Sequence, residues 1–219
     1  MGITIRQPTA ADKEFIITAI TEAEKSGTDV LTYCAIFGIS EAELRVLLGN
    51  ILDEDMEGQE LYIPGFLIAE ADGHPAAAVN AWVEKAGGMS SSIIKSNLFM
   101  YHTSTEILMK AIPAMTLVNE LNIERAANAL QVESIYTVPA YRGLGLARQL
   151  ILKHIAARQA EGIVFDKVQV MLMGDNAHAI RAYEKAGFTE IARKTSSNPA
   201  ITSLLPANTK IMMQRTIEQ

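Results

Sequence analysis

The sequence predicts a mixed α/β or α+β protein whose helices flank a sheet, and three observations lead to that fold class. The chain has 219 residues, of which 49% are hydrophobic, enough for a sizeable core in one large domain. Apolar residues recur at helical spacing in some segments and form short runs typical of strands in others. These segments follow the order of one strand, two helices, several strands and then helices alternating with strands, which is typical of a mixed sheet.

The N-terminal part is predicted to contain one strand and two helices. Residues 3–6 form the strand, and the first helix follows Pro8 and ends at Gly27. Its apolar residues share one face: Phe15, Ile16, Ala19, Ile20 and Ala23. Ser40 and Glu43 open the second helix with the S-x-x-E signature of a capping box.

The middle of the chain is predicted to hold two strands and a helical segment. Residues 66–85 form the strands, joined at the turn pair Asp72-Gly73. The Gly/Ser-rich residues 86–96 are expected to be a loop. Residues 103–130 are expected to be helical and very apolar, with a kink or a break at Pro113, because proline removes a helical hydrogen bond.

The C-terminal part alternates between strands and helices. The predicted order is a strand at 132–138, a helix at 144–162, a buried strand at 167–173, a helix capped by Asn176 that stops at Gly187, and strands at 189–194 and 210–215. Alternation along the strand at 132–138 is expected to place Glu133, Ile135 and Thr137 on one face.

Composition excludes several classes of function. Net charge is −6, with 19 Lys+Arg against 25 Asp+Glu, so nucleic acid is not an expected partner. No apolar run is long enough to predict a membrane span or a signal peptide. Cys34 is the only cysteine, which excludes an internal disulfide and favours a reducing, cytoplasmic setting. The four histidines lack metal-ligand spacing, so no metal is predicted, and His154 is expected on a helix surface.

A glycine-rich turn lies inside the stretch "VPAYRGLGLARQLI", where a predicted strand ends and a helix begins. The first backbone N–H groups of a helix have no internal partner, and the helix dipole adds partial positive charge. Glycine lets an anion approach the backbone closely. The stretch lacks the spacing and the lysine of a P-loop. In a dinucleotide fingerprint Arg148 would take the place of the third glycine after Gly143 and Gly145.

The stretch instead resembles the acyl-CoA loop of the GNAT family, the acetyl-CoA-dependent N-acetyltransferases. The family signature Q/R-x-x-G-x-G/A is matched in full at residues 142–147, with the frequent Pro-x-Tyr-Arg lead-in before it. A second family feature is a strand followed by Asn176 and a helix ending in Y-x-K-x-G-F, here Tyr183 to Phe188. The opening "ITIRQPTAAD" is also similar to the first strand and helix of the family.

The resemblance implies a single N-acetyltransferase domain over residues 1–219, with an insertion at about 89–130. It implies a mostly antiparallel, seven-stranded mixed sheet that is splayed between strands 4 and 5 and flanked by helices. The insertion would be helical and lie between strands 3 and 4. Acetyl-CoA would bind in the gap between the splayed strands.

The same resemblance implies the cofactor contacts. The pyrophosphate would bind the backbone N–H groups of Arg142, Gly143, Leu144, Gly145, Leu146 and Ala147. Thr137 and Val138 would pair with the pantetheine arm through their backbone groups, as a further strand would. Asn176 would both cap its helix and contact the cofactor. Tyr183 would lie on the same helix face as Asn176, two turns further on.

Two residues are the candidate catalytic groups. Tyr183 is the candidate acid, because a phenol with a pKa of about 10 can protonate a departing thiolate. The alternative for Tyr183 is aromatic packing before the Gly-Phe stop. Glu133 is the candidate base for an amine that is mostly charged at neutral pH, and the alternatives for that role are Glu84, Tyr101, His102 or no base at all.

The predicted function is transfer of acetyl from acetyl-CoA to a primary amine of a small molecule by direct attack in a ternary complex. The alternative is an acyl-CoA-binding sensor or structural module without turnover. No motif identifies the acceptor, although the acidic balance favours a cationic one. The apolar 89–130 segment is expected to cover the acceptor site or to form a homodimer interface.

Overall fold

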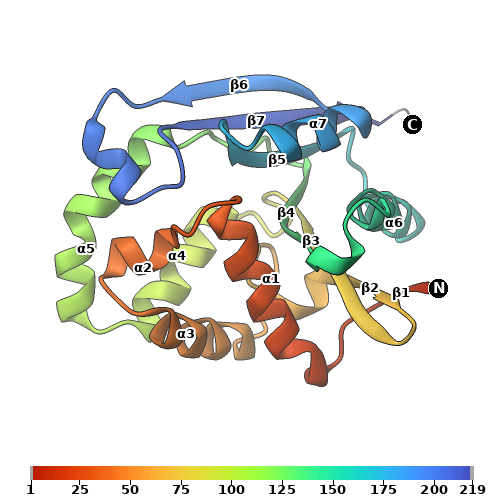
Figure 1. Ribbon diagram of the computed structural model, residues 1–219, viewed down its shortest axis with the longest axis horizontal. Helices are drawn as coiled ribbons and strands as arrows, with labels where there is room; N and C mark the ends of the chain where they lie inside the picture. The colour runs from red at the N-terminus through yellow and green to blue at the C-terminus, as the bar shows by residue number, and fades with distance from the viewer. Residues whose placement is uncertain (1, 218–219) are drawn as a thin grey trace.

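The computed structural model describes residues 2–217 and contains a seven-stranded sheet in the order β1-β2-β3-β4-β5-β7-β6 (Figure 1). The strands are β1 (Ile3–Arg6), β2 (Phe66–Ala71), β3 (His74–Val83), β4 (Leu130–Thr137), β5 (Lys167–Met173), β6 (Thr189–Thr195) and β7 (Thr209–Thr216). Only the β4–β5 pair is parallel, and all other neighbours are antiparallel. The predicted mixed, mostly antiparallel sheet of seven strands is confirmed.

The helices lie on both faces of this sheet. They are α1 (Lys13–Lys25), α2 (Thr32–Phe37), α3 (Glu41–Asp53), α4 (Ser91–His102), α5 (Thr105–Val118), α6 (Leu146–Ala160) and α7 (Ala177–Lys185). The capping box that opens α3 at Ser40 and Glu43 is present as predicted. The short α2 was not predicted. Among the described residues, no helix is both long and apolar enough to cross a lipid bilayer.

The sheet opens between β4 and β5, as the family resemblance implies. These two strands pair only at their first residues, with Leu130 opposite Val168 and Val132 opposite Val170. Beyond that point β4 continues along β3 while β5 continues along β7 (Figure 1). The two halves of the sheet therefore diverge and leave a gap between their strands.

A β-bulge interrupts β4 at Ser134, whose φ of 50° lies in the left-handed region. Asn80 faces Glu133 and Ala78 faces Tyr136, so two residues of β4 oppose the single residue Val79 of β3. The expectation that Glu133, Ile135 and Thr137 share one face by strict alternation is therefore wrong. The extra residue resets the alternation after Glu133.

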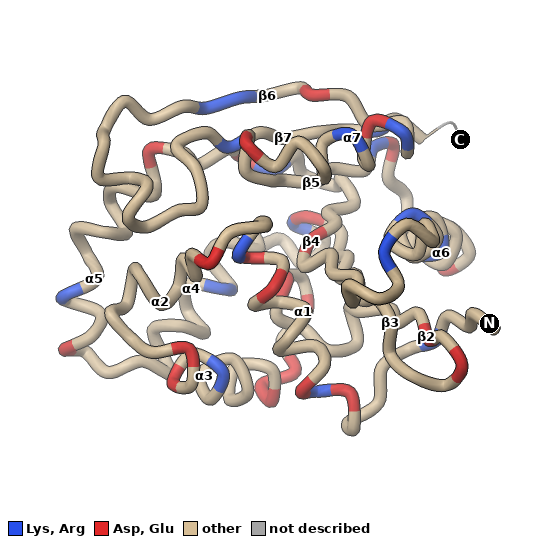
Figure 2. Tube along the Cα trace, viewed as in Figure 1, with Lys and Arg blue, Asp and Glu red and all other residues tan. Residues whose placement is uncertain are grey.

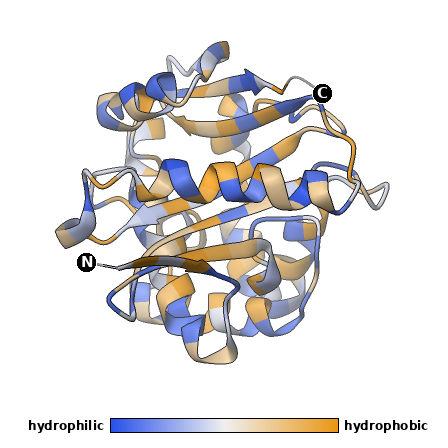
Figure 3. Cartoon of the chain, turned by 90° about the vertical axis from the view of Figure 1, so that its right-hand side faces the viewer, coloured by the Kyte–Doolittle hydropathy of each residue, from blue (hydrophilic) through white to orange (hydrophobic). Residues whose placement is uncertain are grey.

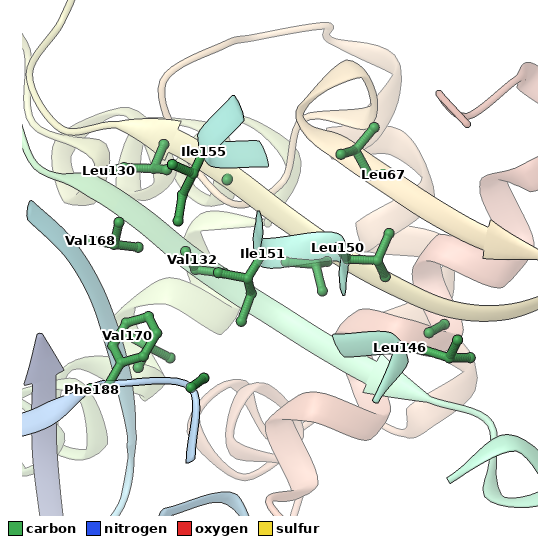
Figure 4. Close-up of a cluster of buried hydrophobic side chains, with 14 of the residues drawn as sticks. Leu67, Leu130, Val132, Leu146, Leu150, Ile151, Ile155, Val168, Val170 and Phe188 are labelled. Atoms are coloured by element: carbon green, nitrogen blue, oxygen red, sulfur yellow. The ribbon is translucent and has the colours of Figure 1, made fainter. Parts of the chain in front are cut away.

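Two apolar cores fill the faces of the sheet. In the first, Leu146, Leu150, Ile151 and Ile155 of α6 pack on β4, β5 and Phe188 (Figure 4). Figure 3 looks onto α6, which crosses the sheet and presents hydrophilic turns between hydrophobic ones. The second core joins α1, α2 and α3 to the opposite face. Ile135 packs against the first core and Tyr136 against the second, as the bulge requires.

The helix α6 also buries a histidine that was expected on its surface. His154 is 4% exposed, and its Nε2 lies 2.9 Å from the carbonyl oxygen of Val79 in β3. Burial lowers the pKa of His154 to about 4. The side chain is therefore a neutral core group that donates to the sheet.

The 89–130 segment forms α4 and α5 and departs from prediction in two places. Helix α4 begins inside the expected loop, where the carboxylate of Glu84 accepts from the N–H of Ser91 at 3.1 Å. Pro113 lies inside a continuous α5 and does not break it. Because proline has no N–H, the carbonyl of Met109 lacks its helical donor. This face of α5 is exposed, so water can solvate that carbonyl.

Candidate active site

A cavity of about 350 Å³ lies at the opening between β4 and β5. Its walls come from α1, α2, the 89–130 segment, β4, β5, α7 and the loop that precedes β7. Glu133, Asn176 and Tyr183 all line it. The structure thus brings these three predicted site residues to one cavity, although they come from three different elements.

The glycine turn lies at the end of β4, where it leads into α6. Gly143 and Gly145 have φ values of 84° and 71°, and Gly145 is the N-cap of α6. Within residues 2–217, the backbone N–H groups of the six positions 143–148 have no hydrogen-bond acceptor. A Cβ at either glycine would meet open space. The turn therefore presents a row of free donors at a helix N-terminus, which fits a phosphate group.

The structure refines the predicted backbone contacts next to this turn. The N–H of Arg142 is not free, because it donates to the carbonyl of Pro139 at 3.3 Å. Its guanidinium Nε donates to the carbonyl of Thr137 at 3.3 Å. Both backbone groups of Val138 are engaged, since its N–H donates to Ala76 and its carbonyl accepts from Tyr141, each at 2.9 Å. The expected pairing of Val138 with pantetheine would have to break these bonds.

Asn176 caps α7 as predicted. Its Oδ1 accepts from the N–H of Ala179 at 3.1 Å, and its Nδ2 donates to the hydroxyl of Ser26 at 3.1 Å. Ser26 is the C-cap of α1, so one amide links the end of α1 to the start of α7 at the edge of the cavity. The cap and the link use different atoms of the side chain.

Tyr183 lies two turns further along α7 and packs its ring against Phe188, with 5.9 Å between the ring centroids. Its hydroxyl has no hydrogen-bond partner in the described part of the chain. Burial, together with the negative charge of Glu133, raises the pKa of Tyr183 well above its usual range. The phenol is therefore protonated at neutral pH and is available as a proton donor to whatever fills the cavity.

Glu133 is held by Arg125, whose Nη2 lies 2.9 Å from Oε1 of Glu133. The Arg125 guanidinium also stacks over the ring of Trp82 at 5.3 Å. Burial raises the pKa of Glu133, and the positive charge of Arg125 opposes that rise. This balance keeps Glu133 a stronger base than a solvated carboxylate would be.

The other candidate bases lie elsewhere. Glu84 accepts hydrogen bonds from the Trp82 indole and from Ser91, both at 3.1 Å, and supports the start of α4. His102 pairs with Glu54 at 2.9 Å, and Tyr101 is 79% exposed. None of Glu84, Tyr101 and His102 lines the cavity.

Sequence reasoning missed a group of charged side chains on the cavity wall. Lys95 Nζ lies 2.6 Å from Oε1 of Glu60, and the hydroxyl of Tyr33 donates to the same oxygen at 3.4 Å. Burial would raise the pKa of Glu60, but Lys95 and Arg125 outweigh it and lower that pKa. Figure 2 shows positions of both signs close together near α1, α4 and β4. A lysine inside the apolar run "SIIKSNLF" was the available signal.

Comparison with known proteins identifies the fold family. A family model described as an acetyltransferase (GNAT) domain matches residues 110–190, which include the glycine turn, Asn176 and Tyr183. Many solved structures also match the chain. The GNAT domain is therefore recognised over these residues, and the solved structures share the fold of the whole chain. No curated protein matches the sequence.

Three solved structures illustrate the shared GNAT fold. An N-acetyltransferase from Staphylococcus aureus Mu50 has a TM-score of 0.65 and 15% identity, with 96% of this chain and 99% of that chain covered. The ribosomal-protein-S18-alanine N-acetyltransferase of Escherichia coli has a TM-score of 0.52 and 15% identity, with 100% and 96% covered. The yncA protein of Salmonella typhimurium, solved with its cofactor acetyl-CoA, has a TM-score of 0.52 and 16% identity, with 100% and 96% covered. Identities this low show a common fold.

Proposed function

We propose that this GNAT protein transfers the acetyl group of acetyl-CoA to a primary amine of a small-molecule acceptor. One observation carries the proposal. The free N–H donors at the start of α6 follow the end of β4, and Tyr183 lies on the helix that follows the end of β5, so both come after the two strands between which the sheet opens. The first feature suits a pyrophosphate, and the second suits the reacting end of a thioester with its acceptor.

In this proposal the described residues hold acetyl-CoA along the opening. The N–H groups of residues 143–148 bind the pyrophosphate, and Arg142 adds positive charge at the surface. The carbonyl of Thr137 accepts the long bond from Arg142, and the pantetheine amide would displace that bond. Asn176 presents its amide at the cavity edge.

Two side chains move the protons. When bound, acetyl-CoA supplies a thioester carbonyl that the neutral amine attacks, with formation of a C–N bond and cleavage of the C–S bond. Glu133 accepts the proton that the amine nitrogen loses, directly or through water. Tyr183 gives its phenolic proton to the departing sulfur. Solvent then carries the proton from Glu133 back to the phenolate, so that an amide and a thiol are the net products.

The proposed acceptor region consists of the early helices, the 89–130 segment and the last loop. Tyr33 of α2, Lys95 of α4, Arg125 and Pro206 line the cavity from these parts of the chain. This arrangement supports the expectation that the 89–130 segment covers the acceptor site. Met109, Ile112 and Met115 leave an apolar stripe exposed on α5, and a homodimer through that stripe stays a prediction.

The extent and setting of the domain also stay proposals. We propose one N-acetyltransferase domain over residues 1–219 with an insertion at about 89–130, of which Met1 and residues 218–219 lie outside the described residues. A cytoplasmic setting is supported by the free thiol of Cys34.

A direct assay tests the proposed function. Release of CoA thiol from acetyl-CoA is measured over a broad panel of primary amines, beside a thermal-shift titration with CoA. The proposal expects turnover with at least one class of amine and a stabilising shift with CoA. A CoA-dependent shift without turnover on any amine would favour the alternative, an acyl-CoA sensor. Absence of both would remove acetyl-CoA from the site.

A further inference from the structure

Two titratable side chains, an acid and a base, line the cavity without a charged partner among residues 2–217: Glu24 of α1 and Lys210 of β7. The remaining charges of the wall are matched to each other, because Lys95 pairs with Glu60 and Arg125 with Glu133. The unmatched pair comes from opposite sides of the sheet opening, since α1 packs on the β1–β4 half and β7 belongs to the other half.

Glu24 has one satisfied and one unsatisfied oxygen. Its Oε1 accepts from the N–H of Tyr33 at 3.2 Å, whereas its Oε2 is buried and has no hydrogen-bond partner among the described residues. Burial raises the pKa of Glu24 to about 8, although the positive charge of Lys95 opposes the rise. The bond from Tyr33 and the influence of Lys95 place the Glu24 carboxylate on the side of the cavity formed by α2 and α4.

Lys210 lines the cavity from β7. In residues 2–217 its ammonium makes no ion pair and no hydrogen bond, and it is absent from the group of sealed, unsatisfied polar atoms. Burial lowers the pKa of Lys210, and Lys95 and Arg125 lower it further. Lys210 is half-buried, and an ammonium with open donors in a partly desolvated cavity wall favours an anion as its partner.

We propose that the acceptor is a zwitterion resembling an amino acid, whose amine docks at Glu24 and whose carboxylate docks at Lys210. The inference rests on the proposed acetyl transfer. A simple amine would fill the cavity and leave Lys210 without a counterion, and an anion without an amine would leave Glu24 without one. A molecule with both charges gives each of the two side chains a partner, and its ammonium favours the ionised form of Glu24.

The acceptor panel that tests this inference keeps the primary amine constant and varies the anionic group and its distance from the amine. It compares amino acids of increasing amine–carboxylate spacing, from glycine to 6-aminohexanoate, with their carboxamides and with plain alkylamines of equal length. For the spacing that fits best, kcat/KM for acetyl transfer should exceed that of the matched carboxamide by roughly tenfold or more. Equal values for acids and amides across the whole series would overturn the inference without any variant.

Two substitutions should act on different ends of the acceptor. Lys210→Met keeps the length of the side chain and should lower kcat/KM for the acid to that of its carboxamide while leaving the carboxamide itself unchanged. Glu24→Gln should lower kcat/KM for acid and carboxamide alike. Lys194→Met is the matched control, because Lys194 lies opposite Lys210 on β6 and is exposed. If Lys210→Met does not fold, Lys210→Gln is measured with the same acids and carboxamides instead.

A binding measurement separates this inference from the proposed function. Calorimetry measures binding of the same acids and amides to the protein with CoA present, where no acetyl group is available for transfer. Acid binding that depends on Lys210, without turnover from acetyl-CoA, would leave the zwitterion site standing and overturn the transferase. Turnover of amines without preference for the acid, and without any effect of Lys210→Met, would support the transferase and overturn the zwitterion site.

Discussion

The side-chain amide of Asn176 donates a 3.1 Å hydrogen bond to the hydroxyl of Ser26, a residue 150 positions earlier in the chain. The same amide caps α7 through its oxygen. Because β4 and β5 stop pairing after Val132 and Val170, this bond links the two halves of the sheet opening at a place where the strands do not. Asn176 therefore links the two sides of the opening in addition to capping its helix.

Substitutions at Ser26 and Asn176 should separate the link from the cap. Ser26→Ala removes the partner of the amide nitrogen and keeps the cap of α7, so urea unfolding should show a loss of about 1 kcal/mol. Asn176→Ala loses the cap as well and should cost about 1 kcal/mol more. Equal stability of Ser26→Ala and Asn176→Ala would mean that the cap contributes nothing.

Gly145→Glu should weaken acetyl-CoA binding by roughly tenfold or more while the protein stays folded, because an anion at the start of α6 repels the pyrophosphate. The φ of 71° at Gly145 adds strain of about 1 kcal/mol for any side chain. Gly162→Glu is the control, since Gly162 has a φ of 75° beyond the opposite end of α6. Calorimetry should show normal affinity for that control. Equal affinities for the two variants would remove the glycine turn from the cofactor site.

Tyr183→Phe should lower kcat by roughly a hundredfold, because the positioned acid is lost while the ring still packs on Phe188. Both kcat and kcat/KM should fall together, and CoA affinity should stay close to that of the wild type. In the pH–rate profile of the wild type, the raised pKa of Tyr183 predicts that the rate is maintained into the alkaline range, because the phenol keeps its proton there. Wild-type turnover in the variant would show that Tyr183 only packs.

The buried His154 should make the protein less stable in mild acid. Its folded-state pKa of about 4 lies below the value of 6.5 for the unfolded chain, so the unfolded state binds the proton first as pH falls. Stability should therefore decline between pH 6.5 and pH 4, by at most about 3 kcal/mol from this group. Urea unfolding of His154→Gln should show a smaller decline. Parallel curves for the two proteins would contradict the assignment of a neutral, buried imidazole.

Glu24→Gln should stabilise the protein at alkaline pH. The wild-type Glu24 lowers stability as pH rises, whereas His154 lowers it as pH falls. The raised folded-state pKa of about 8 means that the unfolded state loses the proton first as pH rises from 4.5. The wild type therefore loses stability between pH 4.5 and pH 8, on the order of 2 kcal/mol after allowance for solvent screening. Glu24→Gln should show no such loss, and the two proteins should converge below pH 4.5. Equal stability at pH 8 would mean that Glu24 is well solvated.

The sequence predicted those features of the fold and the site that are determined by residues close together in the chain. The glycine turn, the cap at Asn176 and the spacing from Asn176 to Tyr183 are all set within a few turns of chain. Asn176 and Tyr183 line one cavity, and the glycine turn follows the end of β4. The strand at 167–173 was predicted with the bounds that β5 has, because a continuous apolar run between polar turns indicates a buried strand.

Features that depend on distant partners were not predictable in this way. Glu24, Lys95 and Lys210 meet at one cavity from three elements, and no spacing in the sequence relates them. His154 looks like a surface residue of α6 until Val79 of β3 is placed opposite it. Helix α4 begins inside a Gly/Ser-rich segment because Glu84, seven residues earlier, accepts from its first turn.

The bulge at Ser134 acts as a spacer within β4. Glu133 and Tyr136 lie opposite Asn80 and Ala78, so they share a face of the sheet although they are three positions apart. Deleting Ser134 would leave a regular ladder in which Ile135 opposes Val79, so Ile135 and Tyr136 would keep the faces on which they now pack. Deleting a regular residue of β4 would instead resemble a frame shift in a message, because every later side chain of the strand would change face. The deletion of Ser134 should therefore be tolerated better than the deletion of a regular residue of the same strand.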